Sequence, residues 1–141
     1  MNIAVRYQSK TGHTAKVADA IAAAVGVSAE PISVPVAPDT DLLFLGGALY
    51  MIYGCNLDPA LVKFIAELPK TVKRAALFGT SALMTFGNKK MLRRFRKAGI
   101  EVCDETFHCY GEFKGLQVGH PDETDLEDAA KWAGRQLTIN N

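Results

Sequence analysis

Several features that would each point to a particular class of protein are missing or scarce in this sequence. The longest nearly uniform apolar stretch, residues 42–53, has 12 residues, which is too few to span a bilayer. Residues 1–9 lack the basic and apolar regions of a secretory signal, so we expect a cytoplasmic protein. The three cysteines are odd in number and have no C-x-x-C spacing, so we expect free thiols and neither a disulfide framework nor a metal site.

An excess of charge of one sign is also lacking. The 16 basic and 15 acidic side chains leave a net charge of +1, whereas a nucleic-acid-binding surface usually carries a clear basic excess. The balance conceals a separation, because residues 101–128 carry nine acidic side chains and a single lysine. The compensating basic residues gather in one predicted helix: Lys89, Lys90, Arg93, Arg94, Arg96 and Lys97.

Two common nucleotide-binding motifs are absent as well. The chain contains no G-x-G-x-x-G and no G-x-x-x-x-G-K-[ST] sequence, so neither a dinucleotide-binding domain nor a nucleoside triphosphatase is supported. No acidic pair ends the first predicted strand, which argues against a phospho-acceptor receiver.

What is present is a regular alternation of short apolar runs and amphipathic helix patterns. The length of 141 residues with 48% hydrophobic content predicts a single domain over residues 1–141. Residues 42–45 and 75–78 are wholly apolar, as in central strands, whereas residues 32–36 and 100–110 carry the proline or polar residues of sheet edges. We therefore expect a three-layer α/β sandwich with a five-stranded parallel sheet of order 2-1-3-4-5. The first predicted strand covers residues 3–7, and the predicted helices cover residues 14–25, 88–98 and segments that begin at Asp58-Pro59 and at Thr124.

The last predicted helix has a sequence-level start signal of its own. Thr124 and Glu127 have the spacing of a capping box. The apolar residues after it predict the buried face: Leu126, Ala130, Ala133 and Leu137.

A short hydroxyl-rich segment follows the first predicted strand. It reads Ser9-Lys10-Thr11-Gly12-His13-Thr14 and leads directly into a helix. Free N–H groups at a helix N-terminus favour an anion, and a glycine allows close backbone approach, so the segment predicts a site for a terminal phosphate. The alternative is that the serine and threonines simply cap the helix.

Residues 3–14, followed by Val17, Ala18 and Ile21, resemble the flavodoxin signature. Residues 42–47, 75–79, 107–111 and 121–122 also follow in flavodoxin order, so the resemblance covers almost the whole chain. It implies a tightly held FMN and one-electron transfer, with the flavin carrying the redox chemistry. No residue is expected to act as a catalytic acid, base or nucleophile.

The resemblance also implies which residues would contact FMN. Residues 9–14 would hold the phosphate, and residues 48–54 and 80–86 would flank the isoalloxazine. Tyr50 or Tyr53 is expected to stack on the ring, and Gly54 would allow the peptide rearrangement that many flavodoxins make beside it. The predicted cofactor-binding set is Ser9, Lys10, Thr11, Gly12, His13, Thr14, Ala48, Leu49, Tyr50, Met51, Ile52, Tyr53, Gly54, Thr80, Ser81, Ala82 and Phe86.

The sequence departs from the flavodoxin pattern in two ways. Residues 79–87 lack the tyrosine and the Gly-Asp that follow the fourth strand in many electron-transfer flavodoxins, so Phe86 or Met84 would have to substitute. Residues 48–57 and 79–88 contain no aspartate or glutamate. Because nearby carboxylates disfavour a reduced, anionic flavin, we expect a less negative reduction potential than in an acidic flavodoxin.

Two other functions stay open at this point. Residues 48–54 are also similar to the corresponding loop of flavodoxin-like protoporphyrinogen oxidase, which favours a small FMN-dependent oxidoreductase acting on a quinone or porphyrinogen. The other is a flavin-free anion-binding module. The basic helix starts beside a predicted ligand loop, so an acidic redox partner or an anionic substrate would dock near Lys89, Lys90, Arg93 and Arg94; a merely solvated helix face is the alternative there.

Overall fold

The centre of the sheet is built from strands whose residues are apolar on both faces. In the computed structural model, which describes residues 1–48, 56–81, 87–112 and 115–139, β3 (Leu42–Ala48) pairs in parallel with β1 (Ile3–Tyr7) on one side and with β4 (Arg74–Ser81) on the other. The outer strands are β2 (Ala29–Pro31), β5 (Glu101–Val102) and β6 (Phe107–Tyr110). The order β2-β1-β3-β4-β5, with β6 also beside β4, confirms the predicted topology.

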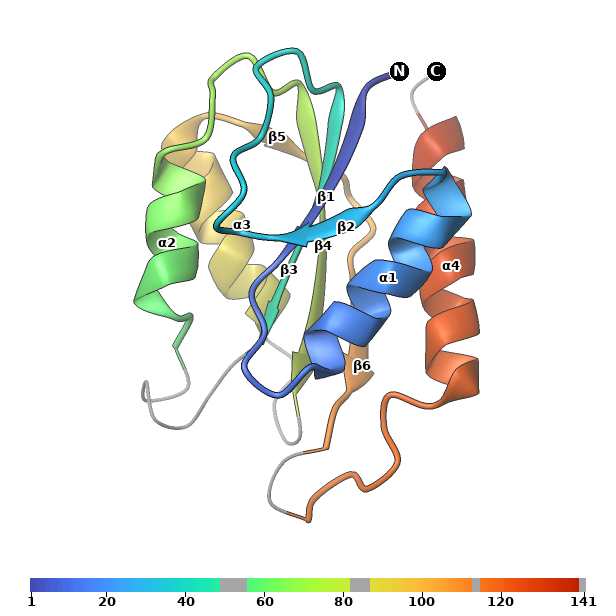
Figure 1. The fold of residues 1–141 in the computed structure, drawn as a ribbon. Coiled ribbons are helices and arrows are strands. Elements are labelled where there is room, and N and C mark those ends of the chain that lie inside the picture. The colour runs from blue at the N-terminus through green and yellow to red at the C-terminus, as the bar shows by residue number, and fades with distance from the viewer. Residues whose placement is uncertain (49–55, 82–86, 113–114, 140–141) are drawn as a thin grey trace.

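Helices cover both faces of this sheet, as Figure 1 shows. The α1 (His13–Val25) and α4 (Glu123–Thr138) helices pack on one face, and α2 (Pro59–Ala66) and α3 (Gly87–Ala98) pack on the other. On the first face the Phe44 ring meets the Trp132 indole edge-on, with centroids 5.6 Å apart. The three-layer sandwich that the sequence predicts is therefore the observed architecture.

The predicted strand over residues 32–36 is wrong, because the strand lies just before it at Ala29–Pro31. The chain turns after Pro31, whose carbonyl accepts from the Val34 N–H at 3.0 Å. The buried Arg6 side chain then donates to the carbonyls of Val34 (3.0 Å) and Pro35 (2.9 Å). A side chain from β1 thus takes the carbonyls that a further stretch of strand would have offered.

The predicted single strand over residues 100–110 is also wrong, because it is interrupted. Both β5 and β6 pair with β4, but the register advances by two residues between Glu101 and Phe107. The intervening loop projects towards α4, where the Glu105 carbonyl accepts from the Trp132 indole N–H at 3.1 Å. The Glu105 carboxylate accepts from Arg135 at 2.9 Å. These contacts favour a loop over a continuous edge strand.

The N-cap of the last helix lies two residues earlier than predicted, at Asp122 instead of Thr124. The capping box is formed by Asp122 and Asp125, each side chain accepting from the other's backbone N–H at 2.9 Å. Thr124, the predicted cap, is inside the helix. The fully buried face is Ala129, Trp132, Ala133 and Gln136, whereas the predicted Leu126, Ala130 and Leu137 are half-buried.

The other predicted helix signals are confirmed. Asp58 caps α2 by accepting from the Ala60 N–H at 2.8 Å, with Pro59 in the first turn. Gly99 ends α3 at a φ of 77°, which is in the left-handed region. No helix in the described ranges is long and apolar enough to cross a membrane.

Candidate functional site

The carboxyl ends of β1, β3 and β4 converge at one edge of the sheet, at the lower end of Figure 1. Strands β1 and β3 are neighbours, and the helices that follow them, α1 and α2, pack on opposite faces of the sheet. In open parallel sheets, ligands bind outside the carboxyl ends at such a switch point. The segment from Ser9 to Thr14 lies at this edge because it directly follows β1.

The segment after β1 ends in a helix terminus without a side-chain cap. Gly12 is the N-cap of α1 at a φ of 87°, and no described side chain bonds the first-turn N–H groups. The Ser9 hydroxyl accepts instead from the Gly12 N–H at 3.1 Å. The alternative that the serine and threonines simply cap α1 is therefore not what the structure shows. The first turn of α1 points its partial positive charge at the site edge.

Buried hydroxyls join this helix start to the sheet. The Thr14 and Thr80 hydroxyls are 2.6 Å apart and buried, which ties α1 to β4. The Ser81 hydroxyl lies 3.0 Å from His108 Nε2, which ties β4 to β6. Three of the predicted site hydroxyls thus fix the relative positions of the elements that surround the site.

On the side of β6, the backbone at Gly111 lies close to the start of α1 and to β4. Gly111 follows β6, and its N–H donates to the Ser81 carbonyl at 3.1 Å. A Cβ on Gly111 would lie 3.2 Å from His13 Cβ and 3.5 Å from Thr80 Cβ. A side chain at position 111 would therefore be in tight contact with His13, and glycine lets the chain after β6 lie near the start of α1 without that contact.

His13 contributes an unsatisfied polar atom at the helix start. Its Nδ1 atom is buried and has no hydrogen-bond partner among the described residues. A buried polar atom without a partner is costly. Together with the uncapped N–H groups, it makes the start of α1 fit an anionic group such as a phosphate.

A carboxylate that the sequence pattern marked only as a helix cap also belongs to this edge. Asp58, 7% exposed, accepts from Gln8 Nε2 at 2.9 Å, and its Oδ2 lies 3.8 Å from Lys10 Nζ. Asp58 therefore joins the segment after β1 to the start of α2. The Asp-Pro pair revealed the cap, but no sequence signal indicates these contacts across 50 residues.

The remaining predicted site residues are placed unevenly. Thr11 is exposed on the segment after β1, and the Ala48 backbone pairs with Thr80 at the end of β3. The other predicted flavin contacts lie outside the described residues: Leu49, Tyr50, Met51, Ile52, Tyr53, Gly54, Ala82 and Phe86.

Comparisons with known proteins agree with this architecture. No protein-family model matches the chain. It is 28% identical over 114 residues to the uncharacterized protein MJ0298 of Methanocaldococcus jannaschii, covering 74% of each chain. A short-chain flavodoxin associated with a bacterial microcompartment superposes over the full length of both chains with a TM-score of 0.75 at 19% identity. Flavodoxin 1 of Bacillus cereus does so with a TM-score of 0.74 at 16% identity. The chain has the flavodoxin fold.

One edge of this flavodoxin fold carries a row of three rings, from His108, Tyr110 and His120. The Tyr110 ring, on a residue 40% exposed, meets His108 edge-on at 5.9 Å and His120 at 6.3 Å between centroids. The row connects the end of β4, through Ser81, with the start of α4. Its period-two spacing on β6 places His108 and Tyr110 on one face.

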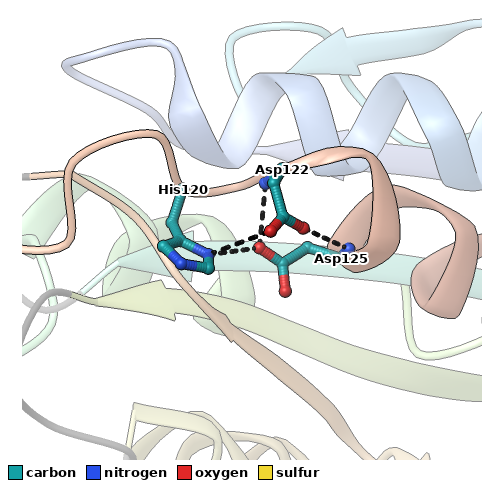
Figure 2. Close-up of side chains that lie close together, drawn as sticks. All are labelled: His120, Asp122 and Asp125. Atoms are coloured by element: carbon teal, nitrogen blue, oxygen red, sulfur yellow. Dashed lines mark hydrogen bonds and ion pairs between the residues drawn. The ribbon is translucent and has the colours of Figure 1, made fainter.

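Figure 2 shows His120 pointing at the carboxylates that begin α4. Its Nδ1 lies 2.7 Å from Asp125 Oδ2 and 3.9 Å from Asp122 Oδ2. The hydrogen bond that the His120 ring donates to Asp125 raises the pKa of His120, despite a smaller opposing effect of desolvation. The three side chains are close enough for a metal ion, but their carboxylates already accept from the capping-box N–H groups. We interpret the cluster as a helix cap.

The described cysteines of the flavodoxin fold are buried free thiols, as predicted. Burial raises the pKa of Cys109 to about 12, with a further contribution from Asp125 and Asp122. Burial also raises the pKa of Cys103. Because the thiolate is the reactive form, neither cysteine is suited to redox chemistry. Cys55 lies outside the described residues.

Proposed function

We propose that this chain binds FMN and carries single electrons between redox partners. The observation that carries the proposal is the α1 N-terminus, which begins without a side-chain cap at the switch point of the sheet. The likeness to full-length flavodoxins supports it, because those proteins have the same extent as this chain. No observation on the described residues favours a substrate-specific oxidoreductase or a flavin-free module.

The FMN phosphate would be held by residues 9–14. The first-turn N–H groups of α1 would donate to the phosphate oxygens, with the Ser9 and Thr11 hydroxyls and the His13 ring close by. Thr14 and Thr80 would keep α1 at its distance from β4 through their buried contact. When bound, the flavin supplies the one-electron chemistry, and residues 48–54 and 80–86 would flank its ring. No side chain has to act as an acid, base or nucleophile.

The scarcity of carboxylates beside the proposed ring position should affect the reduction potential. Residues 48–57 and 79–88 contain none, and the adjacent Asp58 lies beside Lys10. We expect a less negative potential for the last reduction step than in an acidic flavodoxin, because less negative charge opposes the reduced flavin. A redox titration that gives an equally low potential contradicts this.

The proposal also requires a redox partner. A partner protein that docks against α3 agrees with the concentration of positive charge on that helix. The field of such a helix raises the association rate of a negatively charged partner.

The deciding experiment compares FMN with riboflavin, which has the same ring but no phosphate. Purified protein is titrated with each, and binding is followed by the change in flavin absorption and by fluorescence quenching. We expect FMN to bind at least about 100-fold more tightly, because a phosphate at a helix N-terminus forms several charge-assisted hydrogen bonds. Protein that stays colourless with FMN, or that binds riboflavin equally well, overturns the proposal.

A further inference from the structure

A groove with a strongly basic wall lies between α2 and α3. Its volume is about 240 Å³. Leu57 and Val62 give it an apolar floor, and Asn56 lies at the end where α2 begins. The opposite wall consists of four cationic side chains of α3: Lys90, Arg93, Arg94 and Lys97.

These four cations form one stripe along the helix. Their spacing of three and four residues places them on the same face of α3. Met91 and Phe95 face the core and are fully buried. Arg96 lines a different hollow beside Ile100, and Lys89 does not line the groove. The basic residues of α3 therefore divide into a groove set of four and a non-groove pair, Lys89 and Arg96.

Three of the four cations of the groove, Arg93, Arg94 and Lys97, are not neutralised within the described part of the chain. No carboxylate lines the groove, and α3 contains no acidic residue. Arg93, Arg94 and Lys97 form no ion pair with a described residue, whereas Arg135 and Lys73 each have a carboxylate within 2.9 Å. Lys90 donates to Asn56 Oδ1 at 2.6 Å, which holds one cation across the mouth of the groove.

The position of the groove relates it to the proposed flavin site. Asn56 comes two positions after residues 48–54, and α3 begins directly after residues 80–86. These are the two segments that we propose to flank the isoalloxazine. A molecule held in the groove would thus lie next to the flavin edge, where a redox partner has to be placed for electron transfer.

We propose that this groove docks an acidic segment of the redox partner protein. Carboxylates of that segment would lie against Arg93, Arg94 and Lys97, and the methylene groups of its side chains would cover Leu57 and Val62. A nucleic acid fits less well, because outside α3 the chain has ten basic and 15 acidic residues, and a long polyanion would be repelled there. The identity of the bound protein as a redox partner rests on the proposed electron-transfer function, whereas the binding of acidic side chains by the groove does not.

The test uses a fluorescently labelled hexaglutamate peptide and the full-length protein incubated with FMN. Binding is measured by fluorescence anisotropy for the wild type, for R93E/R94E and for the matched control K89E/R96E. Both variants change the same helix by the same charge. We expect R93E/R94E to weaken the peptide affinity by about 10-fold or more, because close charge pairs are lost and replaced by repulsion. The control should change it by about threefold or less, because its charges act only through the screened field.

Three results would overturn the docking site. One is peptide affinity no higher than that of a hexaglutamine peptide. Another is equal weakening by the two variants, which would mean that the charge of α3 acts only as a diffuse field. The third is tighter binding of a DNA oligonucleotide of the same charge, which would assign the groove to nucleic acid. Circular dichroism of both variants serves as the control for folding.

The same samples separate this proposal from the proposed function. FMN titration of each variant should give an unchanged affinity, because neither pair belongs to residues 9–14. If the peptide binds and R93E/R94E weakens this binding more than K89E/R96E does, but FMN does not bind, the docking groove is supported and the electron-transfer function is contradicted. If FMN binds but the peptide pattern fails, the docking site falls and the FMN site stands.

Discussion

The two helices on one face of the sheet, α1 and α4, begin at the same edge of the sheet, but the N–H groups of their first turns are satisfied differently. At α4, Asp122, Asp125 and His120 satisfy the first turn and one another. At α1, Gly12 leaves the first turn without a side-chain cap, and His13 Nδ1 has no described partner. Both starts carry the same partial positive charge. The chain itself completes the start of α4, whereas the start of α1, which has no such cap, is where we propose that the phosphate binds.

The largest effect on FMN binding is expected when the start of α1 is given a negative charge of its own. Thr11→Asp places a carboxylate where we propose the phosphate lies. We expect about a 100-fold loss of FMN affinity, because two anions would share one helix terminus. Fluorescence quenching measures the loss, and Thr11→Asn, which has nearly the same shape without the charge, serves as control. Equal effects of the two variants would show that no phosphate lies there.

The next prediction concerns the buried contact between the Thr14 and Thr80 hydroxyls, which attaches the start of α1 to β4. Thr14→Val should destabilise the fold by about 1–3 kcal/mol, because the buried Thr80 hydroxyl loses its partner. The double variant T14V/T80V should recover part of this loss, since no hydroxyl is then left unpaired. Chemical denaturation of T14V, T80V and T14V/T80V measures the three free energies of unfolding. A double variant as unstable as the sum of the single ones would contradict the contact.

At α4, removal of the cap should affect stability and not FMN. Asp122→Ala should cost about 1 kcal/mol of unfolding free energy, which is typical of a lost N-cap. Thr124→Ala, at the position that the sequence pattern suggested as the cap, should cost less than about 0.5 kcal/mol, as for an ordinary exposed site. If Thr124→Ala were the more damaging change, the capping box would begin where the sequence first indicated.

The smallest effect concerns pH. The pKa of His120 is raised in the folded state, above its usual 6.5, so its contribution is full below pH 6.5 and is lost as the pH rises through the folded value. The pKa of Asp125 is lowered from 3.8: burial opposes this shift, but hydrogen bonds from His120 and the Asp122 N–H outweigh it. Its contribution is lost as the pH falls through that lower value.

Thermal unfolding of the wild type and of His120→Gln between pH 5 and 9 measures the histidine part. We expect the difference between the two to shrink as the pH rises, because neutral His120 keeps only a hydrogen bond. A difference that is constant over this range would mean that His120 does not titrate against Asp125.

The parts of the fold that follow from local pattern were predicted from the sequence. The wholly apolar residues 42–45 and 75–78 gave the central strands, and the polar flanks gave the edges, because burial on two faces requires apolar residues throughout. Asp58-Pro59 and Gly99 marked helix ends through their own backbone preferences. The segment from Ser9 to Thr14 was predicted as a phosphate site from its residue types and its place before a helix, and that role stays a prediction.

The predictions that failed depend on side chains that reach across the fold. Arg6 bonds the carbonyls of Val34 and Pro35, which moves the edge strand. Glu105 bonds Trp132 and Arg135 on α4, which divides the other edge. Edge segments are held by few ladder bonds, so one strong side-chain contact decides where they pair. No periodicity in the sequence records such a contact.

The sequence by itself determined the sandwich and the strand order, because both depend on burial and on the backbone preferences of neighbouring residues. Only the tertiary structure decided that α1 lacks a cap while α4 has one, and that Asp58 joins Lys10 and Gln8. Only the fold also divided the six cations of α3 into a groove set and a non-groove pair. These properties depend on which distant groups are brought within hydrogen-bond or ion-pair distance, and the folded chain alone sets those distances.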